Sequence, residues 1–144
     1  MAERTIRQII EGQELLTAPS VTTVAEAARL MKQRNVGALL VVDGGKLVGM
    51  FTERDGLFRV LAAGLDSAAT PLSAVMTANP RTISPDRSFS HALAFMHEGR
   101  FRHLPVTEND RLVGMISVRD ALGPELEAFV YELLRQEQVS NILA

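Results

Sequence analysis

Apolar and polar residues alternate along the chain in the rhythms of helices and strands. The spacing i, i+3, i+4, i+7 predicts an amphipathic helix, and it is followed by Val24, Ala27, Ala28 and Met31. Next come two apolar runs, 38–42 and 47–51, joined by the turn Asp43-Gly44-Gly45-Lys46. This arrangement predicts a β-hairpin, since adjacent glycines supply the positive φ angles of a tight turn. A further helix is expected over about residues 53–63.

The same order of elements returns later in the chain. A second helical stripe has the same spacing and consists of Phe89, Ala92, Leu93 and Met96. A second hairpin is predicted from residues 103–107 and 112–116, with its turn at 108–110, and a helix over 118–122 follows it. Pro105 lies inside the first of these strands. Because proline has no N–H to donate, we expect its position to face a sheet edge or a bulge.

The two halves of the chain are copies of one unit. The segment 47–55 recurs as 112–120, 65 residues later, with six of nine positions identical. The same register, extended backwards without a gap, pairs Thr17 with Thr82. We therefore expect an α/β fold of the α+β kind built from two repeats.

The predicted organisation has three parts. Residues 1–66 form the first repeat with a short N-terminal helix, residues 67–123 form the second repeat, and residues 124–144 form an amphipathic C-terminal helix. The apolar stripe of that last helix consists of Leu126, Phe129, Val130, Leu133 and Leu134.

Composition narrows the classes of function. The 144 residues are 47% hydrophobic and carry a net charge of −2, so no global field favours nucleic acid or an anionic membrane. The chain has no cysteine, which excludes disulfides, zinc–thiolate sites, iron–sulfur clusters and thiol catalysis. We see neither a signal peptide nor a segment of transmembrane length, and we expect a cytoplasmic protein.

Both copies end in a motif of the same form. The first reads Gly49-Met50-Phe51-Thr52-Glu53-Arg54-Asp55, and the second reads Gly114-Met115-Ile116-Ser117-Val118-Arg119-Asp120 after His103-Leu104-Pro105-Val106. In these residues the unit resembles the cystathionine-β-synthase (CBS) motif, and two in tandem resemble the CBS pair, or Bateman module. The resemblance implies two βαββα motifs packed about a pseudo-two-fold axis. It also implies a two-fold homodimer and adenosine-containing ligands, such as AMP, ADP, ATP, NAD or S-adenosylmethionine, in clefts between the motifs.

The two polar turns have a structural and a functional interpretation. Thr52 with Asp55, and Ser117 with Asp120, have the spacing of capping boxes, in which the hydroxyl and the acid satisfy free helix N–H groups. An ionised Asp can also accept hydrogen bonds from both ribose hydroxyls. Helix N-termini also attract phosphate. The two roles are compatible, and the resemblance favours the ribose role.

Phosphate binding calls for positive partners. Arg54 and Arg119 each precede the acid of their turn, and the second copy adds Arg100 and Arg102. Arginine suits phosphate because its guanidinium makes bidentate contacts, although a solvated surface turn is the plainer interpretation of this pair. The first copy has Asn35 and Gly37 at the matching positions. We therefore expect two unequal sites, the second binding the more anionic group.

The adenine ring is expected to rest near Thr82 and Ile83 and on the strand that carries His103 and Pro105. Leu39 and Leu104 are interpreted as core residues. No catalytic or metal-binding residue is expected, because His91 and His97 do not share a helix face and no nucleophile constellation is present.

The leading hypothesis is a regulatory sensor that binds an adenine nucleotide, forms a homodimer and acts in trans on a protein target that the sequence does not identify. The alternative is a structural dimerisation or interaction module with vestigial pockets, working through the C-terminal stripe. A nucleotide-processing enzyme ranks last.

Overall fold

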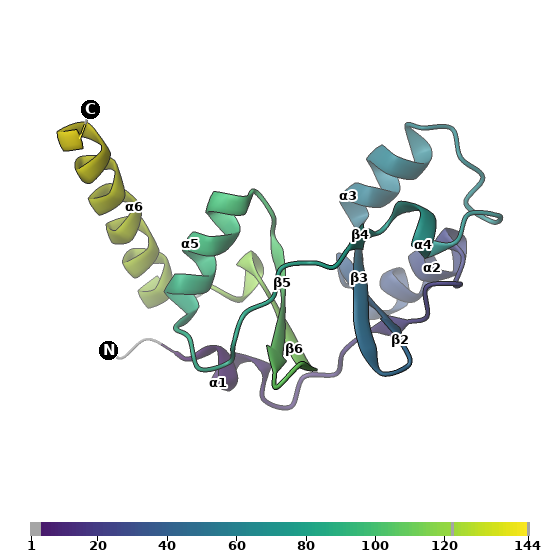
Figure 1. The fold of residues 1–144 in the computed structure, drawn as a ribbon, viewed down its shortest axis with the longest axis horizontal. Helices are drawn as coiled ribbons and strands as arrows, with labels where there is room; N and C mark the ends of the chain where they lie inside the picture. The colour runs from purple at the N-terminus through teal and green to yellow at the C-terminus, as the bar shows by residue number, and fades with distance from the viewer. Residues whose placement is uncertain (1–3, 122, 144) are drawn as a thin grey trace. The chain divides into compact units, whose positions relative to one another are not determined.

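The computed structural model describes residues 4–121 and 123–143. They form two compact units. The first-repeat unit comprises residues 14–81 together with residues 109–112. The second-repeat unit comprises the described residues of 1–13, 82–108 and 113–144. Figure 1 shows the elements of each unit.

The first-repeat unit is built on a four-stranded sheet in the order β1-β2-β3-β4. Its strands are β1 (Thr17–Ala18), β2 (Ala38–Asp43), β3 (Lys46–Thr52) and β4 (Thr77–Ala78). β1 is parallel to β2, and the other two pairings are antiparallel. Its helices are α2 (Val24–Arg34), α3 (Glu53–Asp55), the π-helix η1 (Gly56–Leu61) and α4 (Leu72–Val75).

The second-repeat unit repeats this plan with fewer strands. Its hairpin pairs β5 (His103–Glu108) with β6 (Arg111–Ser117), and residues 109–112 at its tip are those grouped with the first-repeat unit. Its helices are α1 (Ile6–Ile10), α5 (Phe89–Gly99), the 3₁₀ turn η2 (Val118–Asp120) and α6 (Gly123–Leu143). The α+β class and the duplication are confirmed.

The predicted helical stripes face the cores as expected, with one exception. All four stripe residues of α5 are buried, whereas Ala28 on α2 is exposed and its companions are buried. Thr23 and Ser88 cap the two helices at equivalent positions. The first hairpin turn has positive φ at Gly44 and Gly45, and the second has it at Asn109 and Asp110. Asn and Asp tolerate this conformation better than other non-glycine residues, so the second hairpin closes without glycine.

Pro105 explains the main difference between the two sheets. At the matching position of the first repeat, the Leu40 N–H donates to the Leu16 carbonyl oxygen over 3.1 Å. Pro105 has no N–H, and there the parallel pairing shrinks to a single bridge between Ile83 and Val106. The Pro105 carbonyl accepts from the Ile83 N–H on that same side of the strand. Pro105 therefore faces the sheet edge, as predicted.

The elements after the hairpins differ from the predicted α-helices. In the first repeat, one α-helical turn passes into the π-helix η1. In the second, the helix predicted over 118–122 is a single 3₁₀ turn, which ends at Asp120. The aligned peptide dipoles that would attract an anion are correspondingly few there. The α-helix predicted over 118–122 is therefore wrong, and the phosphate site at its N-terminus stays a prediction.

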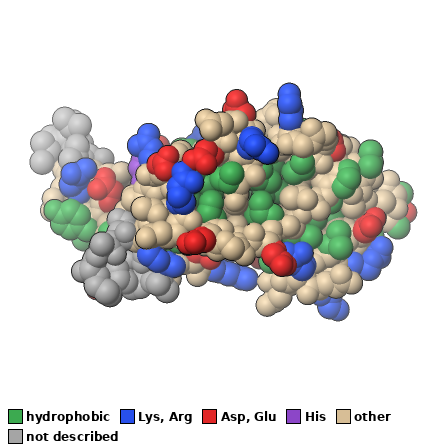
Figure 2. All heavy atoms as spheres, turned by 90° about the horizontal axis from the view of Figure 1, so that it is seen from below, with side chains coloured by type: hydrophobic (Ala, Val, Ile, Leu, Met, Phe, Trp, Pro, Cys, Tyr) green, Lys and Arg blue, Asp and Glu red, His purple; other side chains and the backbone are tan. Residues whose placement is uncertain are grey.

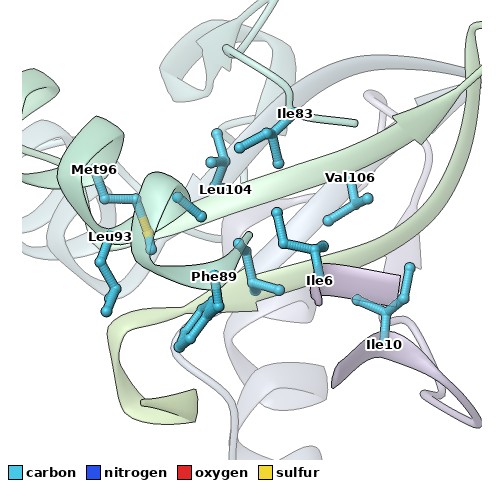
Figure 3. Close-up of a cluster of buried hydrophobic side chains, with 10 residues drawn as sticks. Ile6, Ile10, Ile83, Phe89, Leu93, Met96, Leu104 and Val106 are labelled. Atoms are coloured by element: carbon cyan, nitrogen blue, oxygen red, sulfur yellow. The ribbon is translucent and has the colours of Figure 1, made fainter. Parts of the chain in front are cut away.

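The short segment before each repeat packs against the other repeat in chain order. Ile6 and Ile10 of α1 lie in the second-repeat core with Phe89, Leu104 and other residues (Figure 3). The matching Leu72 and Val75 of α4 lie in the first-repeat core. The backbone pairing is equivalent as well, because the Ile6 N–H donates to Arg87 and the Leu72 N–H donates to Thr22. The sequence pattern predicts that residues 1–66 belong together, but α1 packs in the second-repeat core. The remaining domain boundaries stay a prediction.

The C-terminal helix α6 lies against α5. Phe129 packs against the second-repeat core and its ring meets that of His97 edge-on, with centroids 5.8 Å apart. Leu126, Val130 and Leu134 of the predicted stripe are exposed. Only part of the stripe is therefore covered.

Candidate functional site

The turn Thr52–Asp55 connects β3 to α3 and is a complete capping box. The Thr52 Oγ1 accepts from the Asp55 N–H over 3.2 Å, and the Asp55 Oδ2 accepts from the Thr52 N–H over 3.0 Å. The Glu53 N–H donates to the Gly37 carbonyl oxygen at the start of β2. These bonds fix the acid at the strand-to-helix junction, as the structural interpretation predicted.

A second contact engages the other oxygen of Asp55. The Arg59 Nε lies 3.5 Å from Asp55 Oδ1, four residues along the helical segment. The same guanidinium donates to the carbonyl oxygens of Val75 and Met76, each over 3.2 Å. Asp55 is only 9% exposed and is the buried charged residue of the described core. Both of its carboxylate oxygens thus have protein partners.

The side chain of Arg54 also has a local partner. Its guanidinium lies over the ring of Phe58, 5.3 Å from the centroid. Such a cation–π contact between residues four apart on a helical segment holds the charge at the protein surface. Both predicted ligand groups of this turn, Arg54 and Asp55, are therefore engaged within the first-repeat unit.

The turn Ser117–Asp120 follows β6 and is held differently. The Ser117 Oγ accepts from the Arg119 N–H over 3.2 Å, and the Asp120 Oδ2 accepts from the Ser117 N–H over 2.8 Å. The Val118 N–H donates to the Arg102 carbonyl oxygen over 3.1 Å, which places the start of β5 beside the turn. The structure therefore brings Arg102, Ser117 and Asp120 of the prediction together.

Asp120 is partly exposed, and its second oxygen is open. No described residue donates a hydrogen bond to Asp120 Oδ1. The Arg4 guanidinium reaches the same residue, but it donates to the backbone carbonyl oxygen, over 2.6 Å. This contact involves the backbone of Asp120, so it does not engage Oδ1 of the carboxylate.

Three arginines of the second repeat are exposed. Arg100, Arg102 and Arg119 have no hydrogen-bond or ion-pair partner for their guanidinium groups among the described residues. Arg100 also takes the left-handed conformation that ends α5, with φ of 59°, where Asn35 ends α2 with φ of 52°. Arginine is an unusual residue for that conformation, which favours glycine and asparagine.

The residues predicted near the base lie on one edge of the second-repeat sheet. The Ile83 N–H donates to the Pro105 carbonyl oxygen, and the Ile83 carbonyl accepts from the Thr107 N–H. Ile83 and Pro105 are buried, Thr82 is exposed and His103 is half-buried. The backbone groups of Ile83 are used within the sheet, so they are not available to a base edge.

Three residues that contact these turns or the strand before them were not predicted from the sequence. Arg59 was readable, because it stands four residues after Asp55 on a predicted helix. Arg4 and Gln13 gave no local signal, since they act from a distant segment. The Gln13 side chain bonds both the N–H and the carbonyl of Met115 on β6, over 2.8 and 2.7 Å.

In the described part of the chain, no three His, Cys, Asp or Glu side chains gather as metal ligands would. None of the described helices is both long enough and apolar enough to span a bilayer. Figure 2 shows acidic and basic side chains interspersed over the face that it draws.

The family model described as the CBS domain matches this chain twice, over residues 6–61 and 72–124. The chain belongs to the CBS domain family. Its two matches make it a CBS pair. A curated relative, the CBS domain-containing protein YhcV of Bacillus subtilis, is 39% identical over 107 residues, covering 74% of this chain and 76% of its own length. The CBS domain-containing protein CBSCBSPB5 of Arabidopsis thaliana is 40% identical over 121 residues, covering 83% of this chain, which spans only 22% of that relative.

Solved CBS structures have the same fold. A signal-transduction protein with CBS domains from Burkholderia ambifaria superposes with a TM-score of 0.78 at 37% identity, over 81% of this chain and 90% of its own. The CBS domain pair of protein MJ0100, solved with 5′-methylthioadenosine and S-adenosylmethionine, gives 0.72 at 27% identity, over 83% and 93%. A CBS domain protein of Pyrobaculum aerophilum, complexed with AMP, gives 0.79 at 22% identity, over 89% and 99%, and supports the fold.

Proposed function

We propose that this CBS pair is a regulatory module that binds an adenine nucleotide and acts in trans on another protein. The observation that carries the proposal is the turn Ser117–Asp120, where a carboxylate oxygen stays open beside Arg102. The complex of the related pair of protein MJ0100 with two adenosine compounds supports the ligand class.

Each part of a nucleotide has a proposed partner. An ionised carboxylate accepts both hydroxyls of a ribose, which suits Asp120. Guanidinium groups bind phosphate through paired N–H donors, which suits the unpaired Arg100, Arg102 and Arg119. We place the base against Thr82 and His103, with Ile83 and Pro105 as the buried floor beneath them. Thr52, Arg54 and Asp55 stand at the equivalent positions of the first repeat, where Arg59 already contacts the acid.

A regulatory role, a homodimer and a cytoplasmic location are parts of the same proposal. Regulation is favoured over catalysis because the candidate groups are a diol acceptor and phosphate donors, with no nucleophile paired to a base among them. The mixed charge of the face in Figure 2 offers nucleic acid no single-sign surface there. The absence of cysteine from the sequence agrees with a reducing compartment.

Calorimetric titration with AMP tests the proposal. The double variant Asp55→Asn, Asp120→Asn keeps an acceptor oxygen for each capping bond but removes the charge of both acids. We expect its affinity for AMP to fall at least about tenfold, the weight of a lost charge-assisted hydrogen bond. Asp110→Asn, in the exposed hairpin turn, is the matched control and should bind as the native chain does. A double variant that binds AMP with native affinity would show that the site is elsewhere.

A second candidate function rests on α6. Leu126, Val130 and Leu134 are spaced four apart on one helix and are about half-exposed, at 47%, 50% and 54%. Such an apolar stripe is typical of a helix that packs against a partner. Deleting residues 124–144 discriminates between the candidates. If the truncated chain loses self-association but still binds AMP, α6 serves assembly. If the full chain binds no nucleotide, the interaction module is its function.

A further inference from the structure

The two polar turns differ in what their stabilising arginine touches. In the first repeat, the guanidinium of Arg59 contacts Asp55 Oδ1, the carboxylate oxygen that takes no part in the capping bond. In the second repeat, the guanidinium of Arg4 lies on the backbone carbonyl of Asp120. An arginine thus contacts each turn, but it contacts the side-chain carboxylate in the first repeat and the backbone carbonyl in the second. Asp55 has a partner on each carboxylate oxygen, whereas Asp120 Oδ1 has none among the described residues.

The sequence gives a reason for the difference. By the repeat offset, the position equivalent to Arg59 in the second copy is residue 124, which is proline. Proline carries no charged group, so the second copy has no counterpart of the Arg59 guanidinium at this position. Besides the hydrogen bonds within its own repeat, the second turn is contacted by Arg4 from the N-terminal segment.

We infer that the second repeat alone presents a carboxylate to the cis-diol of a nucleoside, so that each chain binds one phosphorylated nucleoside, through Asp120. This inference rests on the proposed function and narrows it to one of the two repeats. Arg59 is then a specificity-determining residue, because it closes the first turn to the ligand.

The cost of opening the first turn supports the assignment. A ribose at Asp55 would have to displace Arg59 from Oδ1 and from the carbonyl oxygens of Val75 and Met76. The side chain of Asp55 is 12% exposed, so a diol has little room to reach it. Separating a buried carboxylate from its cation is unfavourable, and the two new hydroxyl contacts are neutral. Asp120 incurs neither cost.

The positive charge is distributed in the same sense. In the first repeat, Arg54 rests on Phe58, and Asn35 and Gly37 stand where the second repeat has arginines. In the second repeat, Arg100, Arg102 and Arg119 are exposed without partners among the described residues. A phosphate attached to the nucleoside is therefore attracted to the repeat whose carboxylate is open.

The test titrates the full chain with AMP and with 2′,3′-dideoxy-AMP, which lacks the diol. For the native chain we expect one AMP per chain and a preference for AMP over the dideoxy compound of at least about tenfold. Asp120→Asn should abolish that preference, so that both compounds bind with similar affinity through their phosphate. Asp55→Asn should retain one site and the full preference. A cooperative thermal unfolding transition well above the titration temperature shows that each variant is folded.

The possible outcomes distinguish failure of the one-site inference from failure of nucleotide binding itself. Two equivalent AMP sites in the native chain, or a diol preference lost in Asp55→Asn and kept in Asp120→Asn, would overturn the inference and leave nucleotide binding intact. A native chain that binds no AMP would overturn the proposed function, and the inference would fall with it.

Discussion

At the scale of single residues, the two repeats use different side chains at equivalent positions. Asp43 at the end of β2 accepts hydrogen bonds from the Ser20 N–H and hydroxyl. Its counterpart Glu108 at the end of β5 pairs with Arg7, which also contacts Asp86 over 2.9 Å. Each pair connects a hairpin end to a segment that lies outside the hairpin. Local chemistry has thus diverged while the geometry of the repeat is kept.

The Ser20 contacts predict a pH dependence. These hydrogen bonds favour the ionised form and lower the pKa of Asp43 below its ordinary value. A depressed folded-state pKa gives stability that is present above the unfolded value of about 3.9 and is lost as pH falls through the folded value. We therefore expect Ser20→Ala to lower the unfolding midpoint at pH 7, and the deficit to narrow below about pH 4. A deficit of constant size down to pH 2.5 would contradict this assignment.

Arg100 predicts a conflict between stability and binding. Its left-handed conformation costs about 1 kcal/mol for residues other than glycine, asparagine or aspartate. We expect Arg100→Asn to stabilise the chain by up to this amount and to weaken AMP binding severalfold. Asn35→Arg is the matched reverse change in the first repeat and should lose a similar stability, as urea unfolding measures. An Arg100→Asn variant that gains no stability would show that the conformation carries no cost.

At the scale of elements, each repeat leaves room on its return strand for the segment that precedes the other repeat. A Cβ on Gly114 would lie 2.6 Å from Ile10 Cγ2, and one on Gly49 would meet the side chain of Met76. The two glycines match in the repeat, and so do the segments that cover them. At these two positions glycine is therefore required because a Cβ would collide with the covering segment, and not because of a positive φ angle.

Substituting these glycines should give unequal losses. Gly114→Ala places a Cβ against the β-branched side chain of Ile10, and overpacking of this kind costs about 1–3 kcal/mol. Gly49→Ala meets the unbranched, flexible methionine Met76, which can move aside at a lower cost. Urea unfolding of the two variants checks the order of the losses. A larger loss at Gly49 would contradict this packing account.

Most helices and strands were predictable from the sequence, and the exceptions have physical reasons. The stripes of α2 and α5 and the two hairpins followed from period and turn chemistry, and Pro105 from its missing N–H. The covered position of Ile6 in the second core was not predictable, because an apolar residue on a short helix carries no information about which core it enters. The 3₁₀ turn after β6 ends at Asp120, ahead of the Gly123-Pro124 pair at which the sequence predicts the helix to stop.

At the scale of the whole molecule, the duplication and the family followed from sequence, and the inequality of the two repeats followed in part. The surplus of arginine in the second copy was visible as Arg100 and Arg102. The decisive contrast was not, because it depends on which atom Arg4 and Arg59 each touch. Tertiary packing decides which atom each arginine contacts, and the local sequence does not encode it. The repeated motif therefore predicts two similar sites, whereas the contacts favour the second one.

The measurement that addresses the central claim most directly is the unfolding midpoint of the nucleotide-free native chain with and without adenosine ligands. AMP, ADP, ATP, NAD and S-adenosylmethionine form the panel, and GMP is the control for the base. A ligand at a hundred times its dissociation constant stabilises the folded state by about 2.7 kcal/mol, which shifts the midpoint by several degrees. We predict such a shift with at least one adenosine compound, and its reduction to about half, about 1.4 kcal/mol, in Asp120→Asn. GMP has the same ribose and phosphate, so its shift measures how much the base contributes. An unchanged midpoint with every member of the panel would contradict nucleotide binding and favour the interaction module built on α6.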